Sequence, residues 1–246
     1  MTDPKDTARL ALACLDLTSL NDGDTEADIE RLCQRAQGPH GHTAAVCVWP
    51  RFAAFARARL PATVHVAAVA NFPDGSSDIA RAVRDAQAIA EAGAQEVDVV
   101  IPYRDLDAAP ALLTAVRVAC RGLTLKVILE TGELQDAALI RRAAAMALDA
   151  GADFLKTSTG KVKVNATLEA AALLLQAIRD GGHDQVGFKP AGGVRTVAEA
   201  AAYIALTAEY LGTVTPQRFR IGASGLLNDI EAVLGGAAAA PATSSY

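Results

Sequence analysis

Short apolar runs alternate with longer helix-like segments from one end of the sequence to the other, and this rhythm constrains the fold most. Several of the runs are nearly continuous in valine, isoleucine and leucine, which is typical of strands buried on both faces. Strands separated by helices predict a parallel sheet with right-handed crossovers. Eight runs can be counted, at residues 13–17, 43–49, 64–70, 96–101, 125–130, 153–157, 186–189 and 219–222.

The segments between the runs carry helix signals. Residues 79–92 and 137–150 have apolar side chains at helical spacing, and each is followed by a glycine, which tolerates the left-handed conformation that ends a helix. Thr196 and Glu199 form a capping box, so we predict a helix that begins there and ends at Gly212.

Eight strand–helix units in 246 residues predict an α/β fold, a single (β/α)8 TIM barrel over residues 1–234. A doubly wound open sheet is the main alternative. Residues 235–246 are rich in glycine, alanine, serine and threonine, and we expect them to form a flexible tail that ends in Tyr246.

The bulk properties exclude several classes of protein. The net charge is −5 and no basic run is present, so we expect no nucleic acid partner. No apolar stretch reaches the ~18 residues of a membrane span, and the N-terminus does not resemble a signal peptide. The four cysteines form no Cys-x-x-Cys pair, which argues against zinc and disulfides. We therefore expect a cytoplasmic protein.

Charged residues interrupt the apolar runs, and they are the candidate site. An isolated buried charge is usually one half of an ion pair, because burying it alone is costly. In a TIM barrel, however, the active site lies at the carboxyl ends of the strands, so five such residues suggest a shared site. They are Asp16, Asp98, Lys126, Lys156 and Lys189.

Two lysines one strand–helix unit apart indicate Schiff-base chemistry. A nucleophilic amine must be neutral, whereas a free lysine has a pKa of about 10.4. A second ammonium group close by, in a pocket poor in water, penalises the charged form. Lys156 or Lys189 could then attack a carbonyl and form an imine.

Glycine-containing loops follow the last strands, where TIM barrels commonly bind phosphate with unpaired backbone N–H groups. A threonine and a lysine after the sixth strand add a hydroxyl and a cation. The predicted phosphate-binding residues are Thr159, Lys161, Gly192, Gly193, Ser224 and Gly225.

These motifs, in this order and spacing, resemble the deoxyribose-phosphate aldolase family. The resemblance runs from about residue 10 to the C-terminus, and Lys-Thr-Ser-Thr-Gly followed by Phe-Lys-Pro-Ala-Gly-Gly is its most specific part. The stretches that carry it are residues 15–18, 71–73, 96–100, 125–134, 156–161 and 187–195.

The resemblance implies reversible cleavage of 2-deoxy-D-ribose 5-phosphate to acetaldehyde and D-glyceraldehyde 3-phosphate. It implies that Lys156 forms the imine, that Lys189 lowers the pKa of Lys156, and that Asp98 relays protons through a water. Asp16 would be a supporting polar residue, and the phenol of Tyr246 would help to move a proton. A homodimer without a cofactor is also implied.

One departure from the family pattern is Ser224-Gly225, where a pair of serines is expected. The loss of one hydroxyl donor weakens the predicted preference for phosphorylated substrates. Two alternatives stay open: another Schiff-base barrel enzyme acting on a keto acid, which would use Arg195, and a non-catalytic sugar-phosphate-binding barrel. Cys47, near the mouth of the second strand, is a candidate pocket residue.

Overall fold

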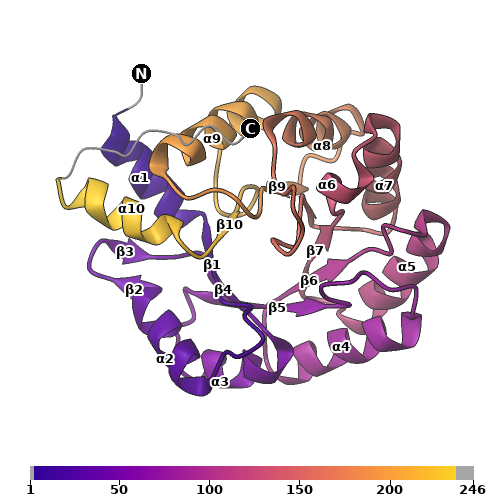
Figure 1. Ribbon diagram of the computed structural model, residues 1–246, viewed down its shortest axis with the longest axis horizontal. Coiled ribbons are helices and arrows are strands. Elements are labelled where there is room, and N and C mark those ends of the chain that lie inside the picture. Colours follow the sequence, from indigo (N-terminus) through magenta and orange to yellow (C-terminus); the bar gives the residue numbers. More distant parts are fainter. Residues whose placement is uncertain (1–2, 237–246) are drawn as a thin grey trace.

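A computed structural model describes residues 3–236, and it contains a barrel of eight parallel strands inside a ring of helices (Figure 1). Each of the eight predicted apolar runs contains one barrel strand or most of it. The strands are β1 (Leu15–Thr18), β4 (Ala45–Val48), β5 (His65–Ala70), β6 (Glu96–Val100), β7 (Thr124–Ile128), β8 (Phe154–Lys156), β9 (Gly187–Lys189) and β10 (Ile221–Ala223).

Closure of the sheet separates the barrel from the open-sheet alternative. The strand order is β10-β1-β4-β5-β6-β7-β8-β9, and each neighbouring pair is parallel. The two ends of this series meet through parallel bridges between Phe188 and Phe219 and between Ala191 and Gly222. The Phe188 N–H donates to Arg218 O at 2.9 Å, and Phe188 O accepts from the Arg220 N–H at 3.1 Å. The prediction of a TIM barrel is therefore confirmed.

The helices surround the barrel and alternate with its strands (Figure 1). Helices α4, α7 and α9 occupy the segments for which the sequence predicted them. The helices are α1 (Pro4–Ala13), α2 (Glu26–Arg35), α3 (Ala53–Arg57), α4 (Ile79–Glu91), α5 (Ala109–Ala119), α6 (Thr131–Leu134), α7 (Ala137–Asp149), α8 (Leu168–Asp180), α9 (Val197–Leu211) and α10 (Leu226–Leu234), with 3-10 turns η1 (Pro50–Phe52) and η2 (Leu106–Ala108).

The predicted helix ends are confirmed by the backbone. Gly93, after α4, and Gly151, after α7, have φ angles of 75° and 78°, in the left-handed region that favours glycine. At the start of α9, the Thr196 hydroxyl accepts from the Glu199 N–H, and the Glu199 carboxylate accepts from the Thr196 N–H.

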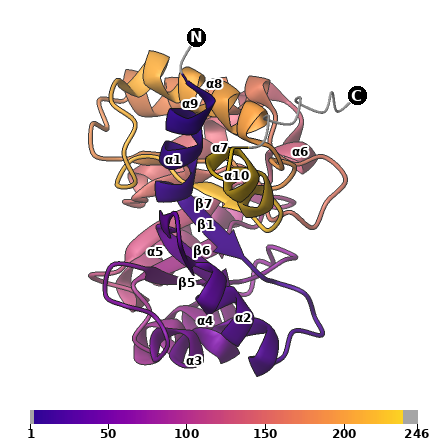
Figure 2. The ribbon, with the colours of Figure 1, turned by 90° about the vertical axis from the view of Figure 1, so that its left-hand side faces the viewer.

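Two elements were not predicted. Helix α1 precedes the first strand and packs against α9 and α10 (Figure 2). The first predicted strand, at 13–17, therefore started two residues too early, because Ala13 still belongs to this helix. A short antiparallel hairpin, β2 (Gln37–Gly38) with β3 (Gly41–His42), lies between α2 and β4. Its strands contain glycine, glutamine and histidine and no apolar side chain that could show a strand period.

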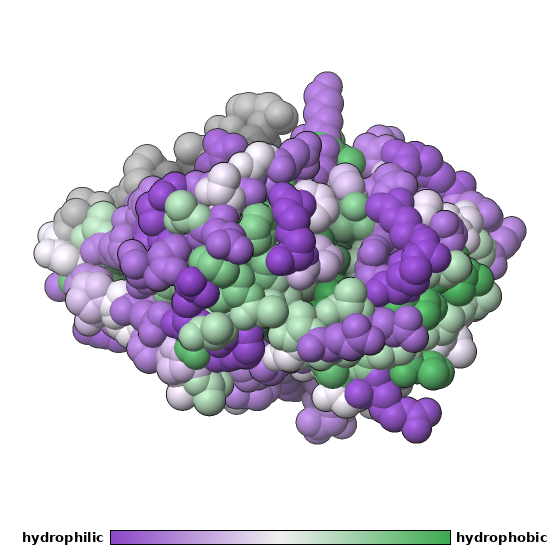
Figure 3. Space-filling view, turned by 90° about the horizontal axis from the view of Figure 1, so that it is seen from below, coloured by the Kyte–Doolittle hydropathy of each residue, from purple (hydrophilic) through white to green (hydrophobic). Residues whose placement is uncertain are grey.

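The apolar core fills the space between the barrel and the helices. Helix α4 buries Ala82, Ala86 and Ile89 against the sheet, and such small residues let a helix lie close to the strands. The surface seen from below the view of Figure 1 mixes apolar and hydrophilic side chains (Figure 3). Within residues 3–236, no helix is long and apolar enough to cross a membrane.

Gly187 on β9 provides a test of the packing at the barrel closure. A Cβ at this position would meet the Phe154 ring and would lie 2.8 Å from Arg218 O, so the two neighbouring strands would have to move. We expect Gly187→Ala to lower the free energy of unfolding by about 1–3 kcal/mol in urea denaturation. Gly23→Ala is the matched control, since nothing lies within 4 Å of the added methyl group. Equal stability of the two variants would contradict this account of the closure.

Candidate active site

Seven ionisable side chains meet inside the barrel, and we call them the buried ion cluster. They come from five of the eight strands and from the residue just before β10, and each is at most 5% exposed. The closed barrel brings them together although they are far apart in the sequence. The members are Asp16, Glu96, Asp98, Lys126, Lys156, Lys189 and Arg220.

Asp98 is the centre of this cluster. Its Oδ2 accepts hydrogen bonds from Lys156 Nζ at 2.7 Å and from Lys189 Nζ at 2.8 Å, and its Oδ1 accepts from Lys126 Nζ at 2.9 Å. Burial would raise the pKa of Asp98, but the three ammonium groups outweigh it and hold this pKa well below its usual range. Asp98 is therefore a carboxylate that joins the ammonium groups of three neighbouring strands.

A second layer of ion pairs lies beneath Asp98. Asp16 contacts Lys189, Lys126 at 3.3 Å and Arg220 at 2.7 Å. Glu96 contacts Lys126, and also Arg220 at 2.8 Å. Each of these cations therefore has at least two carboxylate partners, as stable burial of a charge requires.

Lys156 is the least paired cation of the buried ion cluster, since Asp98 is its one carboxylate partner among the described residues. Four cationic groups face three carboxylates here, so one positive charge stays uncompensated when every group is ionised. Loss of the proton from Lys156 balances the cluster.

The two candidate lysines differ in the direction of their pKa shifts. Burial lowers the pKa of Lys156, Asp98 opposes this, and Lys189 lowers it further. Burial would also lower the pKa of Lys189, but Asp16 and Asp98 outweigh it and raise this pKa. The sequence predicted a second ammonium group in a pocket poor in water, and both burial and Lys189 lower the pKa of Lys156, with burial the larger cause.

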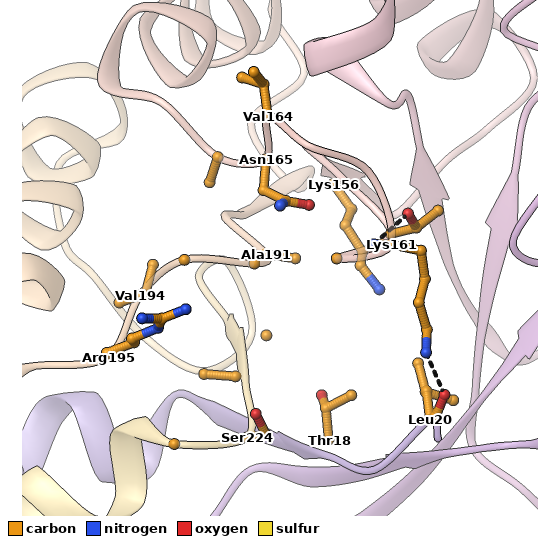
Figure 4. Close-up of a pocket in the computed structure, with 18 of the residues that line it drawn as sticks. Thr18, Leu20, Lys156, Lys161, Val164, Asn165, Ala191, Val194, Arg195 and Ser224 are labelled. Carbon is orange, nitrogen blue, oxygen red and sulfur yellow. Dashed lines mark hydrogen bonds between the residues drawn. The ribbon is translucent and has the colours of Figure 1, made fainter. Parts of the chain in front are cut away.

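A cavity of about 880 Å³ opens above the buried ion cluster, at the carboxyl ends of the strands. Lys156 is the member of the cluster that lines it, and Figure 4 shows its side chain reaching into the cavity. All six predicted phosphate-binding residues line the same cavity, together with Thr18, Lys163 and Asn165. An amine at the floor and glycine loops at the wall therefore face one space.

The glycine loops form part of the cavity wall, where the Gly192 N–H donates to Gly222 O at 3.3 Å. Gly192 and Gly193 have φ angles of 79° and 90°, and a Cβ on Gly192 would lie 2.7 Å from the Asn165 side chain. Gly225 is the N-cap of α10 and supplies no side-chain cap, so the first turn of α10 presents N–H groups at the cavity. This end of the cavity is suited to an anion.

Thr159 and Lys161 lie on the loop between β8 and α8, and they are placed differently. The N–H and the hydroxyl of Thr159 both donate to Glu130, so neither is directed at the cavity. Lys161 Nζ donates to Leu20 O at 2.7 Å, across the cavity mouth (Figure 4). Lys161 thus remains a candidate phosphate ligand, whereas Thr159 belongs to the support of the loop.

The structure also places the remaining candidates. Cys47 lies beneath the cavity rather than in its lining, with its Sγ 3.9 Å from Asp98 Oδ2. Arg195 is exposed at the rim, beside the glycine loop. Tyr246 lies outside the described residues.

Sequence reasoning missed two members of the buried ion cluster. Glu96 appeared only within a family motif, and Arg220 was not considered. Arg220 interrupts the apolar run 219–222 as Asp98 interrupts its own run, so the same signal would have found it. Asn165 and Lys163 carried no such signal, because they lie in a loop.

The sequence pattern of the DeoC/LacD family of aldolases matches residues 10–231. The chain belongs to this family. A deoxyribose-phosphate aldolase from Agrobacterium fabrum (strain C58) is 51% identical over 253 residues, which cover 99% of this chain and 97% of that protein. The protein is therefore an enzyme, an aldolase and hence a lyase.

Solved structures support the same family and fold. The ligand-free structure of a candidate deoxyribose-phosphate aldolase from Toxoplasma gondii has a TM-score of 0.86 and 28% identity, and covers 94% of this chain and 97% of that one. A deoxyribose phosphate aldolase from Aeropyrum pernix, described as a unique tetramer, has a TM-score of 0.75 and 25% identity, over 95% and 94% of the two chains.

Arg220 provides a test of how the buried ion cluster of this aldolase contributes to stability. Arg220→Met would leave Asp16 and Glu96 with less compensating charge, and we expect a loss of about 3–5 kcal/mol in the free energy of unfolding. In the exposed pair of Arg9 with Asp6, Arg9→Met should cost about 0–1 kcal/mol. Urea denaturation of both variants measures the difference, and a loss no greater than that of the control would refute the role given to Arg220.

Proposed function

We propose that this aldolase reversibly cleaves 2-deoxy-D-ribose 5-phosphate to acetaldehyde and D-glyceraldehyde 3-phosphate through an imine on Lys156. One observation carries the assignment of the nucleophile. Lys156 is the cluster member that lines the cavity, and it is also the lysine of the cluster whose pKa is lowered. A neutral amine that faces a substrate cavity is what attack on an aldehyde requires.

The substrate is inferred from the relatives and from the two ends of the cavity. The 51% identical relative is named for deoxyribose phosphate. Lys156 lies at the floor of the cavity, while Lys161, the Gly192-Gly193 loop and the start of α10 lie around its opening. This arrangement suits a sugar whose aldehyde carbon reaches Lys156 while its phosphate binds at the opening.

The first half of the proposed reaction forms the imine. The neutral Lys156 amine attacks C1 of the open-chain sugar to give a carbinolamine. This carbinolamine takes up a proton from solvent as its hydroxyl leaves as water, which gives a protonated imine. The new positive charge develops beside the Asp98 carboxylate, 2.7 Å from the Lys156 nitrogen. Asp98 therefore stabilises the iminium electrostatically.

The second half breaks the C2–C3 bond. The C3 hydroxyl loses its proton, the C2–C3 electron pair moves to the imine, and D-glyceraldehyde 3-phosphate leaves with an enamine of acetaldehyde still bound to Lys156. In our proposal, which follows the family resemblance here, a bound water passes the proton between the hydroxyl and Asp98. Protonation of the enamine carbon and hydrolysis then release acetaldehyde.

Lys189 has a different role in this proposal. Its pKa is raised by Asp16 and Asp98, so it stays an ammonium group throughout the cycle. In that state it disfavours the protonated form of Lys156, while Asp16 holds it in place. We also propose, from the family resemblance, that the enzyme is a homodimer and that Tyr246 assists the protonation of the enamine.

Borohydride trapping tests the nucleophile. Reduction in the presence of 2-deoxyribose 5-phosphate or acetaldehyde should leave a two-carbon adduct on Lys156, found by peptide mass mapping. Lys156→Met should remove the adduct and lower turnover by at least about 10³-fold. Lys5→Met, in an exposed part of α1, is the control and should keep both. An adduct on Lys189 would reverse the assignment of the two lysines, and no adduct on the folded enzyme would exclude the imine.

The pH dependence of kcat/KM tests the role of Lys189. Lys189→Leu removes one ammonium group, so the three remaining cations match the three carboxylates and Lys156 is held in its charged form. The pKa of Lys156 rises as a result. Because only the neutral amine reacts, the acid limb of the profile should move to higher pH and the rate near pH 7 should fall. An unchanged acid limb in a folded variant would rule out this role.

A further inference from the structure

Glu130 is a buried carboxylate that the proposed reaction does not use. It follows β7, is fully buried, and adopts a left-handed backbone conformation with φ 53° and ψ 56°. Such a conformation is uncommon for a residue with a side chain, and it persists where neighbouring contacts require it. The contacts of the Glu130 side chain indicate which neighbours hold the backbone in this conformation.

The side chain of Glu130 accepts its hydrogen bonds from Thr159. The Thr159 N–H lies 3.2 Å and 3.3 Å from its two carboxylate oxygens, and the Thr159 hydroxyl donates to Oε2. Backbone contacts flank Glu130 on both sides: the Leu129 N–H donates to Lys156 O at 3.0 Å, and the Thr131 N–H donates to Thr157 O at 2.9 Å, two residues before Thr159. The Glu130 side chain therefore connects the segment after β7 to the segment after β8, beyond the ends of both strands.

The Thr159 hydroxyl passes this attachment on to Lys161. Its oxygen accepts from the Lys161 N–H at 3.0 Å, across Gly160, which has a φ of 82°. The Lys161 side chain then extends across the cavity mouth to Leu20 O, as Figure 4 shows. A chain of contacts thus runs from Glu130 through Thr159 to the cation at the opening.

A second contact fixes the same loop. Gly132, two residues after Glu130, lies so close to Val164 O that a Cβ on this glycine would collide with it. Asn165, the next residue of the loop, packs against Gly192 of the glycine loop. The turn at 130–132 therefore supports one wall of the cavity, opposite the start of α10.

We propose that Glu130 is a positioning residue that holds Thr159 and Lys161 in place at the cavity mouth, and thereby sets the preference for phosphorylated over unphosphorylated sugars. This inference rests on the proposed function for its substrate. Burial raises the pKa of Glu130, and the hydrogen bonds from Thr159, together with the nearby Lys156, oppose this rise.

The test compares Glu130→Gln with Glu133→Gln, an exposed carboxylate on the same short helix. Glutamine offers one acceptor oxygen in place of two, so Thr159 and Lys161 lose their alignment. We expect the ratio of kcat/KM for 2-deoxyribose 5-phosphate to that for 2-deoxyribose to fall about tenfold, the equivalent of one lost phosphate contact. The fall should arise from KM of the phosphorylated sugar, and Glu133→Gln should leave the ratio unchanged. An equal fall for both sugars would show a structural role only and would overturn the proposal.

A second pair of variants tests the relay without changing Glu130. Thr159→Val removes the hydroxyl and should lower the ratio of kcat/KM for the phosphorylated to the unphosphorylated sugar as Glu130→Gln does. Thr159→Ser keeps the hydroxyl and should give the wild-type ratio. In the Thr159→Val background, Glu130→Gln should have little further effect, because residues that act through one another are not additive. Full additivity of the two changes would overturn the relay.

Calorimetric binding of inorganic phosphate separates this proposal from the proposed function. If the wild-type enzyme fails to cleave 2-deoxyribose 5-phosphate but Glu130→Gln still weakens phosphate binding about tenfold, the substrate is wrong and the positioning role holds. If the enzyme cleaves the sugar and Glu130→Gln binds phosphate as the wild type does, the positioning role is wrong.

Discussion

The carboxylate of Asp98 is the interaction on which the rest of the site depends. It accepts hydrogen bonds from Lys126, Lys156 and Lys189, which come from three successive strands after its own. Three buried ammonium groups this close would repel one another strongly without it, because charges interact more strongly away from water. The barrel must therefore close with these strands in register, because only that register places the three lysines around Asp98.

The buried ion cluster is arranged so that one of its members is left partly uncompensated. Lys126, Lys189 and Arg220 each have two or more carboxylate partners, whereas Lys156 shares its single partner with two other lysines. The surplus of positive charge thus falls on the residue that lines the cavity. A cluster with every cation fully paired would have a more favourable electrostatic energy, but it would hold Lys156, the proposed nucleophile, as an unreactive ammonium group.

The cavity above the cluster combines rigid and loop-borne parts. Lys156, the proposed nucleophile, is on β8, so its position follows from the sheet, while the predicted phosphate ligands are on loops after β8, β9 and β10. Loops need additional support to hold a ligand in one place. Here the support comes from Glu130 and Gly132 on one side and from the contact of Asn165 with Gly192 on the other.

The sequence by itself determined the number of barrel strands, the helices between them and the lysines, because apolar periodicity and charges within apolar runs are local signals. Helix α1 and the β2–β3 hairpin were not predicted, since neither is part of the alternation of apolar runs and helices. Which charges pair was decided by the tertiary structure alone: Arg220 meets Asp16 and Glu96 only because the barrel closes through β10. The difference between Lys156 and Lys189 likewise arises from burial and from partners on other strands, which no stretch of sequence contains.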